Sequence, residues 1–267
     1  YSPGCSLELK MRDLAGNIAT ARRPLFSERG TQGTKPSVEP TVAATTKPRV
    51  QRSDFLRDLN LWFVSFGSPD EGLEMMRTEV PAEAWSRFLR EERGENVTFV
   101  DGRKPMTIGN RPVSLIQDFV RWFEKRSDDG YEYFVPTVEQ WLTAFVDADS
   151  AEVARQRIDD WFTKEFRISL PPRELRYGEN QSFPIGSRKM VETPGTGLLD
   201  MEANVQEIVR AAPGETVYVV IGGSNHHSSV EGLRNACLYH RTFDPDRQEI
   251  QGDRTGLRLC RRPARAR

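Results

Sequence analysis

The segment GLLDMEANVQEIV, residues 197–209, mixes oxygen-bearing side chains with residues that belong in a protein core. The oxygen donors are Asp200, Asn204 and Glu207. The apolar residues between and around them are Leu198, Leu199, Met201, Val205 and Ile208. An acidic loop with so many apolar residues is expected to be anchored to the core. Its oxygen atoms then either hold a hard cation or are used within the fold itself.

The composition is typical of a globular chain. The sequence has 267 residues, of which 37% are hydrophobic and 29% charged, which is enough apolar material for one large domain with attachments. The formal net charge is −1, so no overall field draws the chain to nucleic acid or to an anionic membrane. No apolar run approaches the roughly 18 residues that a membrane-spanning helix needs.

Cysteine usage leaves two alternatives open. Cys5, Cys237 and Cys260 allow at most one internal disulfide, for which Cys237 and Cys260 are the favoured pair. The alternative is that all three are reduced. The three histidines are too few for a recognisable zinc pattern.

Three shifts in composition divide the chain. Within residues 1–26, CSLELKMRD and IATARRPLF flank the turn sequence LAGN and predict a terminal β-hairpin. Residues 27–52 contain three prolines and no aromatic residue, which indicates a flexible linker. Residues 53–263 have the apolar periodicity of a folded domain, and residues 264–267 form a basic tail.

The folded domain is expected to be α+β. Apolar spacing predicts four helices, over residues 80–94, 111–126, 136–146 and 151–166. Thr137 and Gln140 fit a capping box at the start of the third helix. LNLWFVSFG and TVYVVIGGS are predicted strands. Beyond Phe166 proline and glycine recur, and no regular helix is expected there.

Four blocks in a fixed order resemble the formylglycine-generating enzyme (sulfatase-modifying factor) family, over roughly residues 55–262. The blocks are MMRTEVPAEAWSRFL, YFVPTVEQWLTAF, FPIGSRKMVETPGTGLLDMEANVQEIV and VIGGSNHHSSVEGLRNACLYHRTFDPDRQEIQGDRTGLRL. The resemblance implies a C-type lectin-like fold: a small twisted sheet, flanking helices and long irregular loops. The hairpin of residues 1–26 resembles the end of a bacterial immunoglobulin-like domain.

The resemblance also bears on activity. Active members of the family oxidise a substrate cysteine to formylglycine with a cysteine pair and copper, and thiolates suit Cu(I). That pair follows the Gly-Gly-Ser block closely. Here Gly222-Gly223-Ser224 is followed by His227 and Gly232 at about those positions. Copper chemistry of the family type is therefore not expected, and the chain resembles a pseudoenzyme.

In the family, the loop that matches residues 200–207 can bind calcium. The resemblance assigns the carboxylates of Asp200 and Glu207 to that site, with backbone carbonyls near Ala203 and Val205. Such an oxygen set suits a hard cation. In the alternative, Asp200 and Asn204 cap turns while Glu207 pairs with a nearby arginine.

We therefore expect a non-catalytic recognition or scaffold module of a bacterial cell-envelope or secreted protein, located outside the cytoplasm. Residues 167–196 and 225–255 would form a face for a protein or glycan, since tyrosine and arginine are common anchors. The candidate binding residues are Tyr177, His226, His227, Tyr239 and Arg241.

Two other functions fit the same residues. The first is a metal-dependent oxidase with non-standard ligands near His226, His227 or Cys237. Adjacent histidines on an extended segment point to opposite faces and do not easily share one metal. The second is a subunit of a larger surface assembly.

Overall fold

The computed structural model describes residues 6–12, 18–24, 54–97, 105, 112, 114–166, 196–202, 204–224, 227, 229–242 and 255–264. The chain divides into two compact units, Tyr1–Arg49 and Val50–Arg267. Residues 27–52, predicted as a linker, lie outside the described residues, as do 167–195 and 243–254.

The first unit contains the predicted hairpin. Strand β1 (Ser6–Arg12) pairs antiparallel with β2 (Ile18–Pro24), and Leu9 lies opposite Ala21. The turn sequence between them lies outside the described residues. A two-stranded hairpin is marginally stable in isolation, so this pair is expected to need further strands.

The second unit contains two four-stranded sheets. The first has the order β3-β4-β10-β5 and is antiparallel throughout. Its strands are β3 (Phe63–Ser65), β4 (Glu74–Met76), β10 (Cys260–Pro263) and β5 (Tyr131–Phe134). The predicted strand at LNLWFVSFG is thus real but short.

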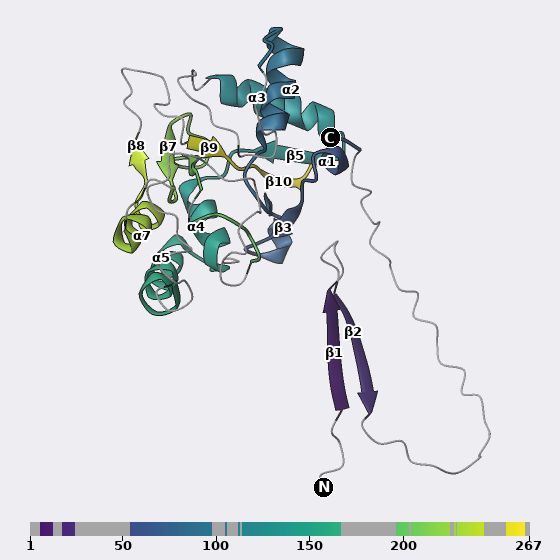
Figure 1. Ribbon diagram of the computed structural model, residues 1–267, viewed down its shortest axis with the longest axis vertical. Helices are drawn as coiled ribbons and strands as arrows, with labels where there is room; N and C mark the ends of the chain where they lie inside the picture. Colours follow the sequence, from purple (N-terminus) through teal and green to yellow (C-terminus); the bar gives the residue numbers. More distant parts are fainter. Residues whose placement is uncertain are drawn as a thin grey trace, which may run out of the picture. The chain divides into compact units, whose positions relative to one another are not determined.

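The second sheet has the order β8-β7-β6-β9 and is mixed, because β6 and β9 run parallel. Its strands are β8 (Arg241–Thr242), β7 (Tyr218–Ile221), β6 (Gln206–Arg210) and β9 (Thr255–Leu257). Strands β9 and β10 are consecutive in the chain but belong to different sheets (Figure 1). The last strands therefore link the two sheets.

Helices flank the sheets, so the α+β prediction is confirmed (Figure 1). They are α1 (Asp54–Asp58), α2 (Ala82–Arg93), α3 (Ser114–Ser127), α4 (Val138–Val146), α5 (Ala151–Trp161) and α7 (Val230–Leu238). A short 3-10 turn, η1 (Pro69–Glu71), precedes β4, and a π turn, η2 (Phe162–Phe166), continues α5.

The capping box predicted at α4 is present. The Thr137 hydroxyl accepts a hydrogen bond from the Gln140 N–H at 3.2 Å, and the Gln140 side chain accepts one from the Thr137 N–H at 3.0 Å. Two otherwise unbonded N–H groups of the helix start are thereby satisfied. All four predicted helices are confirmed as α2 to α5, with small differences at their ends.

The prediction of no regular helix after Phe166 is wrong. Helix α7 is capped by Ser229, whose hydroxyl accepts from the Gly232 N–H at 3.0 Å, and it buries Leu233, Cys237 and Leu238. Gly232, a weak helix former, lies inside the first turn. The buried positions are nevertheless spaced as a helix requires.

Two hydrophobic cores lie on opposite faces of the strands. Met75 and Val209 belong to one core, while their neighbours Met76 and Ile208 belong to the other. Successive side chains of a strand point to opposite faces, so β4 and β6 contribute to both cores. This double burial explains why β7 is apolar without alternation and why β6 is buried on both faces although it carries Gln206 and Glu207.

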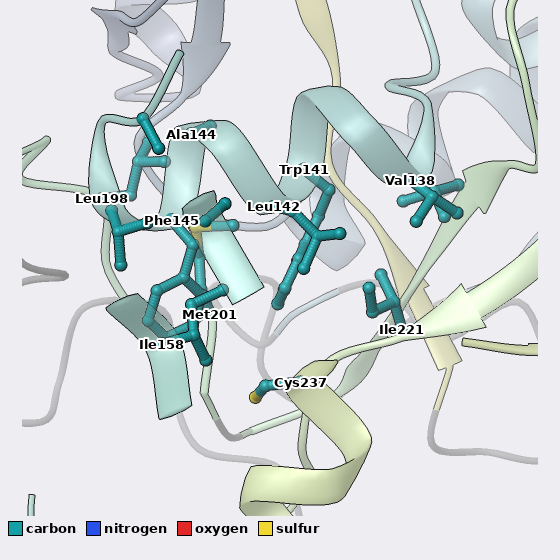
Figure 2. Close-up of a cluster of buried hydrophobic side chains, with 14 of the residues drawn as sticks. Val138, Trp141, Leu142, Ala144, Phe145, Ile158, Leu198, Met201, Ile221 and Cys237 are labelled. Carbon is teal, nitrogen blue, oxygen red and sulfur yellow. The ribbon is translucent and has the colours of Figure 1, made fainter. Parts of the chain in front are cut away.

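The first core gathers around α4 (Figure 2). Trp141, Leu142 and Phe145 pack there with Ile158 of α5 and Ile221 of β7. The second core is aromatic and lies between α2 and α3. Its interlocking rings include Trp85, Phe88, Phe119, Trp122 and Phe123.

Cys237 and Cys260 are both free thiols and fully buried in the first core. The disulfide between them is therefore not formed, and these two cysteines follow the reduced alternative. Cys5 lies outside the described residues. Of the predicted basic tail, the Ala264 N–H donates to the Gly130 carbonyl at 2.9 Å, and residues 265–267 lie outside the described residues.

Within the described part of the chain, no helix has the length and apolar character needed to cross a bilayer.

Substituting Gly223 by alanine should strongly destabilise this unit. A Cβ there would lie 1.9 Å from the Glu202 carbonyl oxygen and 2.5 Å from the Leu233 side chain. We expect the free energy of unfolding to fall by about 3 kcal/mol, measured by denaturant titration.

Gly232→Ala is the matched control. Its new Cβ would come no closer than 3.2 Å, to the Ser229 hydroxyl, so a change under about 1 kcal/mol is expected. Equal effects of the two substitutions would show that the close approach at Gly223 is not real.

Candidate functional site

The acidic loop surrounds a buried ion pair. Arg258 and Glu207 expose 0% and 1% of their side chains, and the guanidinium lies 2.7 Å from the carboxylate. The other Glu207 oxygen accepts from the Trp141 indole N–H at 2.7 Å. Arg258 also donates to the carbonyls of Met76 at 2.9 Å and Leu199 at 2.8 Å. The pair is thus satisfied on both sides, as buried charges require.

The rest of the loop folds tightly against this pair. Asp200 and Asn204 have φ angles of 62° and 76°, the left-handed conformation that these residue types tolerate in turns. Both are buried, and the Asn204 amide donates to the Glu79 carboxylate at 3.1 Å. The predicted anchoring of the loop to the core is confirmed, since Leu198, Met201 and Ile208 are fully buried as well.

Glu79 is a third buried carboxyl in this region. Burial raises its pKa well above the ordinary value, and the negative charge of Asp200 raises it further. The positive charge of Arg258 acts in the opposite direction. The protonated form of Glu79 is therefore favoured in the folded protein.

These contacts bear on the predicted calcium site. Both oxygens of Glu207 are already used, one by Arg258 and the other by Trp141. This is the alternative arrangement, in which Glu207 pairs with an arginine. Asp200 is buried beside it and Val205 is buried too, but Ala203 lies outside the described residues. The Glu207 side chain therefore fits the arginine-paired arrangement better than the role of a calcium ligand.

Among the residues with described side chains, no three His, Cys, Asp or Glu groups are arranged to hold a metal ion.

His227 stands near the Gly-Gly-Ser block and is half-buried. Its Nδ1 lies 2.9 Å from the Ser224 backbone nitrogen and 3.3 Å from the Ser224 hydroxyl. Burial lowers the pKa of the imidazole, a hydrogen bond with the Ser224 backbone raises it, and the nearby Arg241 charge lowers it, with a net lowering. The contact in which Nδ1 accepts from the Ser224 N–H fixes the turn before α7.

The structure brings together some predicted binding residues. Tyr239 follows α7 with 64% of its surface exposed. Arg241 is exposed on the edge strand β8, and its guanidinium donates to the Gln206 side chain. Both lie within a few residues of each other beside α7, whereas Tyr177 and His226 lie outside the described residues.

Helices α5 and α7 also border a groove that the sequence analysis did not predict. Its volume is about 550 Å³, in the usual range for ligand pockets. It is lined by Glu152, Val153, Arg155, Gln156, Asp159, Arg234, Leu238 and Tyr239. One signal was available, because Val153 interrupts the polar face of the predicted helix that buries Ala154, Ile158 and Trp161.

The sequence matches no protein-family model, and no curated protein matches it. The family resemblance therefore rests on the four sequence blocks alone.

Glu79→Gln should stabilise the folded unit most at high pH. A group whose pKa is higher in the folded than in the unfolded chain contributes to folding stability. This contribution is fully present below the unfolded pKa and is lost as pH rises through the folded pKa. Glutamine keeps the acceptor for Asn204 without a charge. We expect its unfolding free energy to exceed the wild-type value by about 1–2 kcal/mol at pH 8 and by much less at pH 4.

The exposed Glu215 provides the control, since Glu215→Gln also removes one carboxyl group. Denaturant titrations across this pH range measure both variants. A Glu79→Gln curve parallel to that of the wild type would mean that Glu79 is not protonated by folding.

The ion pair also predicts the response to chelation. Since both oxygens of Glu207 already accept hydrogen bonds from Arg258 and Trp141, we expect chain purified without chelator to carry well under one calcium ion, measured by mass spectrometry. Added chelator should leave the thermal midpoint unchanged. About one calcium per chain, lost in Asp200→Asn, would instead support the predicted loop site.

Proposed function

We propose that residues 53–263 form a non-catalytic recognition or scaffold domain of the formylglycine-generating-enzyme type, with a C-type lectin-like fold. It would belong to a bacterial cell-envelope or secreted protein and bind a protein or glycan. Two small sheets with flanking helices are compatible with this fold. The hairpin before it would belong to an immunoglobulin-like domain.

The observation that carries the proposal is the local role of His227 and Gly232. They stand about where the family places its cysteine pair. His227 is hydrogen-bonded within the turn at Ser224, while the Gly232 N–H is bonded to the cap of α7. One residue fixes a turn and the other begins a helix, and neither can supply a thiolate.

The nearby thiols are poor replacements for that pair. Cys237 and Cys260 are fully buried, and burial raises the pKa of both thiols. The negative charge of Glu202 acts in the same direction on Cys237. A protonated, inaccessible thiol neither attacks a substrate nor binds copper readily.

The surface supports recognition instead. Tyr239 and Arg241 are exposed close together after α7, next to the groove between α5 and α7. Such side chains dominate binding energy at protein interfaces. A rigid helix end with exposed tyrosine and arginine is well suited to hold a partner.

Two measurements test this function. Iodoacetamide should label neither Cys237 nor Cys260 in the native chain, and it should label both in the denatured chain. Peptide mass mapping reads the labelled positions. With copper, oxygen and a cysteine-containing peptide, the chain should form no aldehyde. Aldehyde formation, or labelling of native Cys237, would overturn the non-catalytic assignment in favour of an oxidase.

A further inference from the structure

Exposed apolar side chains are concentrated beside α5 and α7. Among the described residues, the large hydrophobic side chains that are exposed are Val153 at 42%, Val217 at 52% and Tyr239 at 64%. Val153 and Tyr239 line the same groove, and the nearly buried Leu238 lies in it as well. Neighbouring exposed apolar groups in a hollow are typical of an interaction site.

Two contacts fix how the helices border this groove. Asp159, near the end of α5, pairs with Arg234 in the middle of α7. Arg155, one turn earlier in α5, donates to the carbonyl of Leu238 at the end of α7 at 3.4 Å. The two helices, which are neighbours in Figure 1, therefore run roughly antiparallel, and the start of α5 lies beside the end of α7. Val153 and Tyr239 meet the groove at this shared end.

The two arginines that line the groove differ in their ion pairing. Arg234 is neutralised by Asp159 and Glu231. Arg155 has no carboxylate within ion-pair distance in the part of the chain that the structure describes, and its one hydrogen bond there is the long contact to Leu238. The apolar end of the groove thus lies next to the Arg155 guanidinium, which pairs with none of the described carboxylates, and the exposed Glu152 also lines this end.

We propose that this groove binds a protein segment that carries an apolar side chain next to a carboxylate. The apolar side chain would cover Leu238 between Val153 and Tyr239, and the carboxylate would pair with Arg155. The proposal rests on the recognition function above and specifies its partner.

The chemistry favours a protein segment over a glycan. Val153 offers aliphatic surface without a hydrogen-bonding group beside the buried Leu238. Such a surface suits an aliphatic or aromatic side chain better than a sugar with many hydroxyls. A guanidinium matches the planar carboxylate of Asp or Glu in a bidentate arrangement. Tyrosine and arginine together are also the residues that most often anchor protein interfaces.

A displayed library of random short peptides, selected on the full chain, tests the proposal. Selected peptides should share an aliphatic or aromatic residue adjacent to Asp or Glu. The affinity for a consensus peptide, measured by calorimetry, should fall by about tenfold or more in each of three variants. They are Val153→Asp, Tyr239→Ala and Arg155→Glu. Binding should also weaken as salt is added, because the carboxylate contact is screened.

Matched controls separate the groove from general surface effects. Val217→Asp changes another exposed valine, and Arg90→Glu reverses another exposed arginine, on α2. Neither residue lines the groove, so both variants should bind the peptide as the wild type does. Circular dichroism and thermal midpoints verify that every variant is folded.

Three results would overturn the inference. One is that the selected peptides share no sequence feature. Another is that a consensus peptide binds the Val153→Asp and Arg155→Glu variants as tightly as the wild type. The third is binding to a glycan array that is lost in Tyr239→Ala while no peptide is selected. None of them bears on the oxidation assay, so failure of this inference and failure of the non-catalytic function are distinguishable.

Discussion

The buried guanidinium of Arg258 is the interaction on which the folded unit depends. It lies between β9 and β10, consecutive strands that belong to different sheets. From there it bonds Glu207 of β6, the Met76 carbonyl of β4 and the Leu199 carbonyl of the acidic loop. A buried charge that loses such partners costs several kcal/mol. The two sheets and the loop therefore have to pack together.

Because of this constraint, the buried polar residues of the acidic loop stabilise the fold, and only surface residues are free to contact a partner. Two polar residues of segment 197–209, which first point to a ligand, are used to hold the fold: Glu207 binds Arg258 and Trp141, and Asn204 binds Glu79. The groups that the proposed recognition would use lie outside, on α5, β8 and the end of α7, where apolar and cationic side chains are exposed. A domain built in this way can change its surface helices without disturbing its central ion pair.

The sequence predicted elements whose local signals agree. It missed very short elements, and it also missed α7, where Gly232 lies inside an otherwise helical spacing. Helix α4 was predictable because its capping box and its apolar spacing agree. Strands β4 and β9 have three residues each, too few for a strand period to appear. The pairing of Glu207 with an arginine was anticipated only as an alternative, since 51 residues separate it from Arg258. The groove arises from two helices far apart in sequence, and only the exposed Val153 hinted at it.

A double-mutant cycle on the ion pair is the most direct test of this account. Unfolding free energies would be measured by denaturant titration for Glu207→Gln, Arg258→Met and the double variant. If the pair organises the unit, each single substitution should lower the free energy of unfolding by about 3–5 kcal/mol, because it leaves the other buried group without its partner. The double variant should then cost at least about 2 kcal/mol less than the sum of the two. Small, additive losses would contradict the central role assigned to Arg258.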